Sequence, residues 1–417
     1  MNDASAIVLS TPETRVTPRE AVYSFVLDDP GNSAPESYFV SVPAEYESWI
    51  SHSLDPSLSI GMLRAMSRAT GLWVDGPVDP VYASRVEDEL QRLMSSSFVA
   101  LRPVPVKFGS YEPSERAAPI AHVLAFSGGV DSMYSLLQLI ERANRSAPTI
   151  THLLFISYER FSHVTGSRLS RIQQFADQLG LPLIPVKTNF DTAFSEPISP
   201  RYWLYTKIHE ALFLAVASAL GRNSVNFYFS STYPVETTNR INRYQSSNLL
   251  GLVFSGASYG AANFNVEGAG VTRFQKIAAI SQSPLAQRNL DVCDASFQGN
   301  KRNCSRCIKC SHTLVVLDAL GTTAEFDQVF DIDSFRSRRT STYMRIVSMG
   351  SPIAREITNS LRSDCGRTPF VVRLVLAARL DYVISWPDKI FRSTKGWVLE
   401  HSLFRQMVRR LQKLRNA

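Results

Sequence analysis

The sequence predicts an α/β protein built on a doubly wound, parallel β-sheet. From residue 122 onward, short apolar runs typical of buried strands alternate with amphipathic stretches of helical length. Strands separated by helices of this length are joined by right-handed crossovers and lie parallel. Apolar residues make up 44% and charged residues 19% of the 417 residues, so a folded chain of two or three domains is expected rather than disorder.

The first 115 residues are predicted to form a small α+β domain. Two strand-like runs, residues 21–27 and 37–42, precede helical patterns at residues 59–71 and 82–97. The stretch "KFGSYEPSERAAPIA" then interrupts all periodicity with proline, glycine and serine, which marks a domain boundary. No catalytic group of residues stands out here, and a protein or RNA partner is one interpretation of this domain.

Residues 116–330 are predicted to form the main α/β domain. Gly180 and Gly321 are expected to end two of its helices as C-caps. Residues 250–270 hold five of the chain's 20 glycines and show little periodicity, so a loop is predicted there. The strands are expected at residues 122–126, 151–157, 181–188 and 225–231, and the helices at residues 133–143, 167–180, 205–221 and 311–321.

Residues 331–417 are predicted to form a basic, mainly helical C-terminal segment. They contain 17 Lys and Arg against 7 Asp and Glu, a net charge of +10, which leaves −3 for the first 330 residues. Such a segment can bind the phosphates of RNA or DNA. It can also be a solvated helical face whose basic side chains cover apolar surface. The sequence leaves both interpretations open.

A soluble, cytoplasmic protein without a membrane partner is expected. The first residues show no basic region followed by an apolar stretch, which a secretory signal would have. The longest strongly apolar run, residues 211–220, is about half of the roughly 20 residues needed to cross a bilayer. A homodimer is compatible with the sequence.

The motif "SGGVDS" lies between a predicted strand and a predicted helix. Gly128 and Gly129 let the backbone turn tightly and approach a ligand. Backbone N–H groups at the start of a helix attract an anion, and Ser127 and Ser132 add hydroxyl groups. Asp131 would repel a phosphate unless a Mg²⁺ ion is shared between them. The motif therefore predicts a site for a phosphate or pyrophosphate with its magnesium.

This motif resembles the PP-loop of the N-type ATP pyrophosphatases, Ser-Gly-Gly-x-Asp-Ser. The match covers every position from Ser127 to Ser132, with Val130 at the variable one. The resemblance implies that the protein binds ATP and Mg²⁺ and cleaves ATP between its α and β phosphates. A carboxylate or amide oxygen of the substrate would attack the α-phosphorus, and ammonia, an amine or a related nucleophile would then displace AMP. By position in the family, the adenine would lie near Phe155 and Ser157.

Four of the five cysteines form a second motif, C-x10-C-x2-C-x2-C. Closely spaced thiolates converge on one ion, and four of them fill a tetrahedral structural Zn²⁺ site. Unliganded cysteines are one alternative. Another is an iron–sulfur cluster, which some PP-loop enzymes that thiolate tRNA carry on three cysteines. The predicted zinc ligands are Cys293, Cys304, Cys307 and Cys310.

The order and spacing of these cysteines resemble the zinc site of the 7-cyano-7-deazaguanine synthases. Residues 121–321 are therefore similar to that branch of the PP-loop superfamily, over roughly half of the chain. The preceding domain and the basic segment after residue 330 depart from that pattern, as does the long loop before residue 270. These departures indicate a divergent relative, for which synthesis of a deazaguanine base is one option among several.

Weaker candidate residues lie near the two motifs. Ser230 and Ser231 lie at the carboxyl end of a predicted strand, at the sheet edge where α/β proteins bind ligands, either as substrate contacts or as turn caps. Arg273 and Lys276 would meet the α-phosphate or the leaving group, or else lie on the solvated surface.

Together with these residues, the resemblance to the PP-loop family implies an ATP-dependent ligase or synthase that forms AMP and pyrophosphate. Its substrate would be an unidentified small molecule or peptide. One alternative is an RNA-modifying enzyme of the tRNA-thiolating type, and another is a nucleotide-binding scaffold without turnover. The expected catalytic residues are Asp131, Ser132, Arg273 and Lys276.

Overall fold

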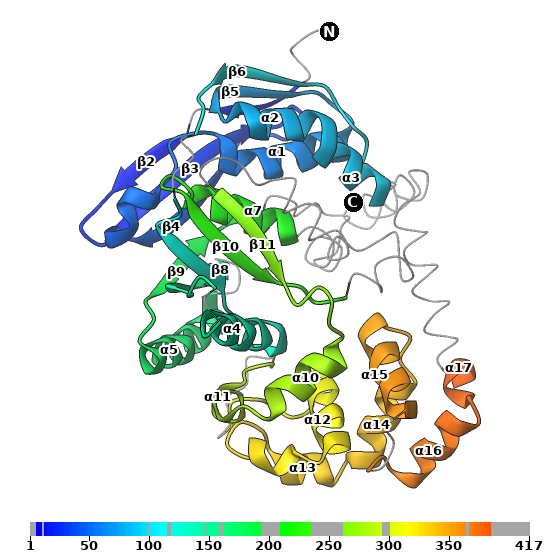
Figure 1. Ribbon diagram of the computed structural model, residues 1–417. Coiled ribbons are helices and arrows are strands. Elements are labelled where there is room, and N and C mark those ends of the chain that lie inside the picture. Colours follow the sequence, from blue (N-terminus) through cyan, green and yellow to red (C-terminus); the bar gives the residue numbers. More distant parts are fainter. Residues whose placement is uncertain are drawn as a thin grey trace.

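One continuous β-sheet runs through the described part of the chain (Figure 1). It has eleven strands in the order β11-β10-β7-β8-β9-β4-β3-β1-β5-β6, with β2 beside β3. Six of the ten strand pairings are parallel, so the predicted α/β class with a mostly parallel sheet is confirmed. The computed structural model describes residues 6–10, 12–97, 101–114, 118–145, 147–158, 162–192, 209–234, 262–293, 301–363 and 367–384.

The all-parallel part of the sheet reverses its winding at β7. Strands β8 and β9 lie on one side of β7, and β10 and β11 lie on the other. In open α/β sheets, ligands bind at the carboxyl ends of the strands where the order reverses, which here means β7 and β10. The strands are β7 (Ala121–Ala125), β8 (His152–Tyr158), β9 (Leu183–Thr188), β10 (Val225–Ser230) and β11 (Ala262–Glu267), and the helices between them are α4 (Val130–Ala143), α5 (Ser162–Leu179) and α7 (His209–Ala219).

The N-terminal elements extend the same sheet. Strand β4 pairs antiparallel with β9, with Val40 opposite Thr188 and Ser41 opposite Lys187. The predicted strands and helices of this part are confirmed, whereas the boundary at residue 115 stays a prediction. The strands are β1 (Ile7–Ser10), β2 (Glu13–Val16), β3 (Glu20–Asp28), β4 (Glu36–Pro43), β5 (Leu72–Val78) and β6 (Val106–Tyr111), and the helices are α1 (Asp55–Arg68), α2 (Pro80–Arg85) and α3 (Gln91–Ser97).

Two hydrophobic cores lie on opposite faces of the sheet. Successive side chains of a strand point to opposite faces, so Val123 of β7 belongs to one core and Leu124 to the other. The first core joins the N-terminal elements to α7, and α1 packs against α7. The second core joins α4 and α5 to the helices that follow β11. Helix α4, which begins within the "SGGVDS" motif, is therefore held in place from the second face together with α5.

Strand β11 corrects the prediction of a loop over residues 250–270. Residues 262–267 pair in parallel register with all of β10, from Val225 opposite Ala262 to Ser230 opposite Glu267. The segment "ANFNVE" alternates small or apolar residues with polar ones, which is the period of a strand with one buried face. The surrounding glycines hid this short alternation. Residues 235–261 lie outside the described part.

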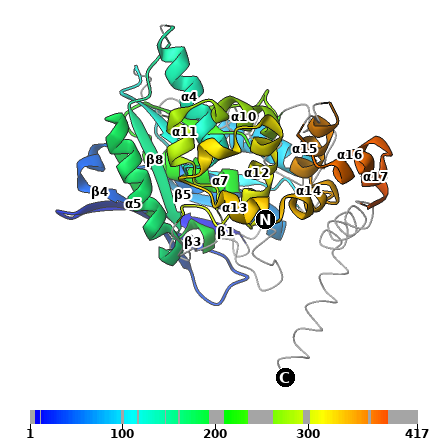
Figure 2. The same ribbon diagram turned by 90° about the horizontal axis from the view of Figure 1, so that it is seen from below.

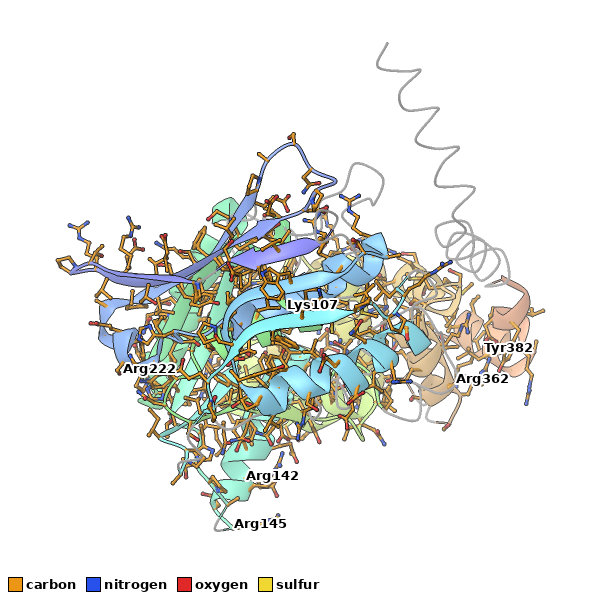
Figure 3. All side chains as sticks on the ribbon, turned by 90° about the horizontal axis from the view of Figure 1, so that it is seen from above. Lys107, Arg142, Arg145, Arg222, Arg362 and Tyr382 are labelled. Carbon is orange, nitrogen blue, oxygen red and sulfur yellow. The ribbon has the colours of Figure 1, made fainter. Side chains whose placement is uncertain are left out.

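The elements that the structure describes after β11 are all helices, joined by turns and loops. Helix α10 packs against α4, and α15 packs against both α10 and α12. Figure 2 shows α10 and α11 beside α4, and α14 and α15 further out, next to α16 and α17 at the outer edge. There Arg362 of α15 lies over the ring of Tyr382 of α17, at 4.9 Å from its centre (Figure 3). The helices are α10 (Arg273–Ser281), α11 (Pro284–Asn289), α12 (Ile308–Leu320), α13 (Ile332–Arg336), α14 (Arg339–Val347), α15 (Pro352–Ser363), α16 (Phe370–Ala377) and α17 (Leu380–Ile384).

The predicted mainly helical C-terminal segment is thus confirmed up to residue 384, and the end of that segment lies outside the described residues. Within the described ranges, no helix has the length and apolarity needed to cross a bilayer.

Candidate functional site

The "SGGVDS" motif forms the turn from β7 into α4, at the carboxyl end of the strand where the winding reverses. Gly128 has a φ of +76°, a conformation that side-chain-bearing residues rarely adopt. Gly129 is the N-cap of α4 and provides no side chain to occupy the first backbone N–H groups. Val130 is buried in the second core and anchors the helix start. The loop therefore leaves N–H groups of the first turn available to a ligand.

The two serines of the loop have different environments. Ser132 is buried, and its hydroxyl donates to the Gly129 carbonyl at 3.2 Å while accepting from the Ser127 N–H at 3.3 Å. Ser127 is exposed, with its Oγ 3.4 Å from that of Ser132. Ser132 therefore shapes the loop, whereas Ser127 lies on the side open to a ligand.

Two cations from α10 meet the Asp131 carboxylate. Arg273 Nη2 lies 2.9 Å from Asp131 Oδ2, and Lys276 Nζ lies 3.4 Å from Asp131 Oδ1. Thr272 begins α10 with a capping box, which places both cations in the first turns of that helix. The structure thus brings together the three charged residues to which the sequence assigned the chemistry.

Lys276 is the most constrained of these groups. Its side chain is fully buried, so the alternative of a solvated surface residue is wrong for this lysine. Its Nζ also donates to the backbone carbonyl of Ser231, just beyond β10. Burial lowers the pKa of Lys276, and Asp131 partly opposes that shift. The lysine therefore joins the carboxyl end of β10 to the first turn of α4, at the point where the winding of the sheet reverses.

Glu356 is a member of this cluster that sequence reasoning missed. It lies on α15, and its Oε1 accepts the backbone N–H of Phe274 at 3.0 Å. Burial raises the pKa of Glu356, and the nearby Arg273 partly opposes that shift. The sequence carried no specific signal for it, because Glu356 is one of seven acidic residues in residues 331–417.

Several polar atoms beside this cluster are buried without a hydrogen-bond partner among the described residues. They are Arg273 Nε, Glu356 Oε2 and His312 Nε2. Burial, with Arg273 next in effect, lowers the pKa of His312 to about 3, so its ring is neutral at physiological pH. Buried polar groups are nearly always paired, so orphaned atoms of this kind mark places where water or a polar ligand binds.

The remaining nucleotide-site candidates have mixed placements. The Ser231 hydroxyl donates to the Tyr233 carbonyl at 2.6 Å, the turn-capping role that the sequence left open. Ser230 Oγ is buried at the end of β10 without a partner in the described structure. On β8, Phe155 packs in the second core and Ser157 is half-buried. Their proposed roles towards the adenine stay predictions.

The four cysteine sulfurs converge within 4.8 Å of one another. Cys310 Sγ lies 3.8 Å from Cys304 Sγ and 3.4 Å from Cys307 Sγ. A tetrahedral Zn²⁺ with bonds of about 2.3 Å to sulfur separates its ligands by about 3.8 Å. The Cys307 N–H donates to Cys304 Sγ at 3.2 Å, and Ser305 between them has a φ of +57°. The residues therefore fit a single ion such as zinc.

The burial of these thiols also suits a structural metal site. Hydrogen bonding with Cys307 raises the pKa of the Cys293 thiol to about 11. Cys293 and Cys310 are buried, which shields such an ion from water. The donor set leaves no open position, as expected for a structural site rather than a catalytic one.

Compared with protein-family models, curated proteins and solved structures, the chain matches none. The chemistry of the site therefore rests on its own residues and geometry. A loop of free N–H groups, two cations and one carboxylate meet at a sheet edge suited to ligand binding. Such a site can hold a polyphosphate and stabilise negative charge that develops during its cleavage.

Proposed function

We propose that the protein is an ATP-dependent ligase of the PP-loop type. It adenylates a carboxylate or amide oxygen of its substrate, releases pyrophosphate, and transfers the activated group to ammonia, an amine or a related nucleophile. The observation that carries the proposal is the convergence of Asp131, Arg273 and Lys276 on the "SGGVDS" loop. A glycine turn of structural use alone would not need two cations brought from a helix more than 140 residues later.

Each residue has a defined task in this proposal. The N–H groups of the first turn of α4 and the Ser127 hydroxyl bind the β and γ phosphates. Arg273 and Lys276 stabilise the negative charge that builds on the pyrophosphate as the bond between the α-phosphorus and the bridging oxygen breaks. The substrate oxygen forms the new bond to the α-phosphorus. Displacement of AMP by the nitrogen nucleophile then completes the transfer.

Asp131 is the residue that would hold Mg²⁺ in this site. Its carboxylate provides the hard oxygen ligands that Mg²⁺ prefers, and its side chain is 18% exposed, so an ion can reach it. Bound Mg²⁺ supplies charge neutralisation between the carboxylate and the phosphates. Because Arg273 and Lys276 pair with the same oxygens, the ion has to compete with them.

The orphaned polar atoms support a second, adjoining place for the acceptor substrate. Arg273 Nε and Glu356 Oε2 belong to side chains of the phosphate cluster, and His312 interacts electrostatically with Arg273. A substrate carboxylate or amide beside the α-phosphate would find both a donor and an acceptor there. The substrate is therefore proposed to be a polar small molecule or peptide, with a deazaguanine precursor as one case.

The zinc ion has a structural task in this proposal. Sulfur separations of 3.4 and 3.8 Å suit four ligands on one ion. A cubane iron–sulfur cluster instead places its cysteines on separate iron atoms, further apart. The geometry therefore favours the ligase over the tRNA-thiolating alternative. Metal analysis separates the two, because one zinc without iron or acid-labile sulfide is expected here.

Product analysis tests the proposed function. The purified protein is incubated with Mg²⁺, ATP labelled at the α-phosphate, ammonia and pools of carboxylate and amide substrates, and pyrophosphate exchange into ATP is followed in parallel. AMP and pyrophosphate are expected, whereas ADP and phosphate would overturn the proposal. Binding of ATP without turnover in any pool would favour the scaffold alternative.

A lysine pair provides the matched variants for this assay. Lys276→Met should reduce AMP formation at least a hundredfold, since a charge-assisted donor to the leaving group contributes about 3 kcal/mol. Lys107→Met removes an exposed lysine on β6, at the far end of the sheet from β11, and should react at the wild-type rate (Figure 3).

A further inference from the structure

Asp291 supports the "SGGVDS" loop from the side of the cysteine motif. Its backbone N–H donates to the Gly128 carbonyl at 2.8 Å, and a Cβ added at Gly128 would lie 3.3 Å from the Asp291 Cβ. The Asp291 side chain is buried, with 2% of its surface exposed. Its carboxylate accepts from Arg171 Nη2 at 2.6 Å and from Arg168 Nη2 at 3.1 Å. Two arginines of α5 thus fix the segment that presses on the loop.

Asn303 ties this segment to the cysteine motif. The side chain is fully buried, and its Oδ1 accepts the N–H groups of Val292 at 2.7 Å and Cys293 at 3.1 Å. Its Nδ2 donates to the carbonyls of Leu290 at 2.8 Å and Val329 at 3.1 Å. Both N–H groups of this side-chain amide donate a hydrogen bond and its oxygen accepts two, so the amide is fully hydrogen-bonded. Asn303 therefore holds the chain on both sides of Asp291. Cys304, which follows Asn303 in the sequence, is a predicted metal ligand.

We propose that Asp291 is a positioning residue for the ATP loop, and that Asn303 makes this position depend on the metal centre. The inference rests on the proposed function, in which the loop binds the phosphates of ATP. A metal ion bound by Cys293 and Cys304 fixes the two segments that Asn303 joins. Through Asp291 it also holds the Gly128 carbonyl in place. When the loop is already ordered, less of the binding energy of the ligand is lost in ordering it, and the ligand binds more tightly.

Hydrogen exchange measured by mass spectrometry tests this link without turnover. The zinc-loaded full chain is compared with the same protein after treatment with a chelator. Faster exchange is expected in peptides that cover residues 121–133 and 284–293, with β3 and β4 unchanged as an internal control. Faster exchange confined to residues 301–310 would overturn the link between the metal centre and the loop.

Two variants of the zinc-loaded protein test the role of Asp291 directly. Asp291→Asn keeps the shape but removes the charge that the two arginines bind, and should weaken ATP binding about tenfold or more while zinc content stays at one per chain. The matched control is Asn289→Ala, whose amide donates within α11 to the Leu285 carbonyl at 3.0 Å, and it should bind ATP normally. Wild-type ATP affinity and loop exchange in Asp291→Asn would contradict the proposal.

The outcomes separate this inference from the proposed function. Exchange that depends on zinc and Asp291, in a wild-type protein that binds no ATP, would overturn the ATP function and support the positioning role. If the protein forms AMP and pyrophosphate but the hydrogen exchange of its loop does not depend on zinc or Asp291, the ATP function is supported and the positioning role is overturned.

Discussion

Replacing Asp131 by asparagine separates its two tasks, because its pairing with the two cations affects the stability of the free protein, whereas its binding of Mg²⁺ affects the affinity for the nucleotide. In the free protein the carboxylate lies 2.9 Å from Arg273 Nη2 and 3.4 Å from Lys276 Nζ. At an effective dielectric constant of about 20, each attraction is about 5 kcal/mol before desolvation is counted. The three side chains are between 1% and 18% exposed, so screening by water is weak. Loss of one partner in such a buried group costs about 3 kcal/mol of unfolding free energy.

Calorimetric titration with ATP, in Mg²⁺ and in EDTA, measures the second effect. For wild-type protein, Mg²⁺ should strengthen ATP binding. In Asp131→Asn the benefit of Mg²⁺ should fall about ten- to a hundredfold, which corresponds to one charge-assisted contact of about 1.5–3 kcal/mol. In EDTA the variant should bind ATP at least as tightly as wild type, since repulsion between carboxylate and phosphate is gone. Glu141→Gln, on the exposed side of α4, is the control. An undiminished Mg²⁺ benefit in Asp131→Asn would refute a metal-binding role for this carboxylate.

Three further changes have defined outcomes. Gly128→Ala should destabilise the fold by about 1–2 kcal/mol and weaken ATP binding, because φ is +76°, whereas Gly270→Ala, with open space around its Cβ position, should be neutral in urea unfolding. Cys310→Ser should abolish stoichiometric zinc measured by mass spectrometry, while Cys365→Ser, at the fifth cysteine and outside the motif, should retain it. Burial lowers the pKa of Lys276, so its charged form costs stability, and this cost is relieved as pH rises from the folded pKa toward 10.5. The unfolding free energy of wild type relative to Lys276→Met should therefore rise over that alkaline window, and a constant difference would contradict the assignment.

The parts of the fold that sequence predicted well are those with local signals. The apolar run of β7, the two glycines and the following amphipathic helix are contiguous, so their order alone defines a strand, a turn and a helix. The cysteine cluster was equally accessible, because C-x2-C steps place neighbouring sulfurs on one side of a turn. Strand β11 was missed because its six residues lie between glycines, and its pairing with β10 adds the stability that its own sequence lacks.

The polar contacts around the loop could be predicted only in part. Arg273 and Lys276 are spaced three apart on one helix face, which predicts that they act together but not that α10 packs on α4. Asp291, Asn303 and Glu356 act through backbone contacts with distant segments, and no local pattern records such partners. Their roles follow from how the helices after β11 close over the second face of the sheet.

Under the proposed function, the charge balance of the cluster determines how its ligands arrive. Asp131 and Glu356 nearly neutralise Arg273 and Lys276, which lets a fully buried lysine and three partly buried ionisable groups stay together without a ligand. If ATP binds without Mg²⁺, its phosphates pair with the two cations, and the Asp131 carboxylate is left facing phosphate. If Mg²⁺ binds without ATP, it pairs with the carboxylate, and the two cations are left without a partner. MgATP exchanges both sets of contacts at once, since the cations pair with phosphate while the carboxylate pairs with the metal. Nucleotide and metal are therefore expected to bind cooperatively, each raising the affinity for the other by the same factor.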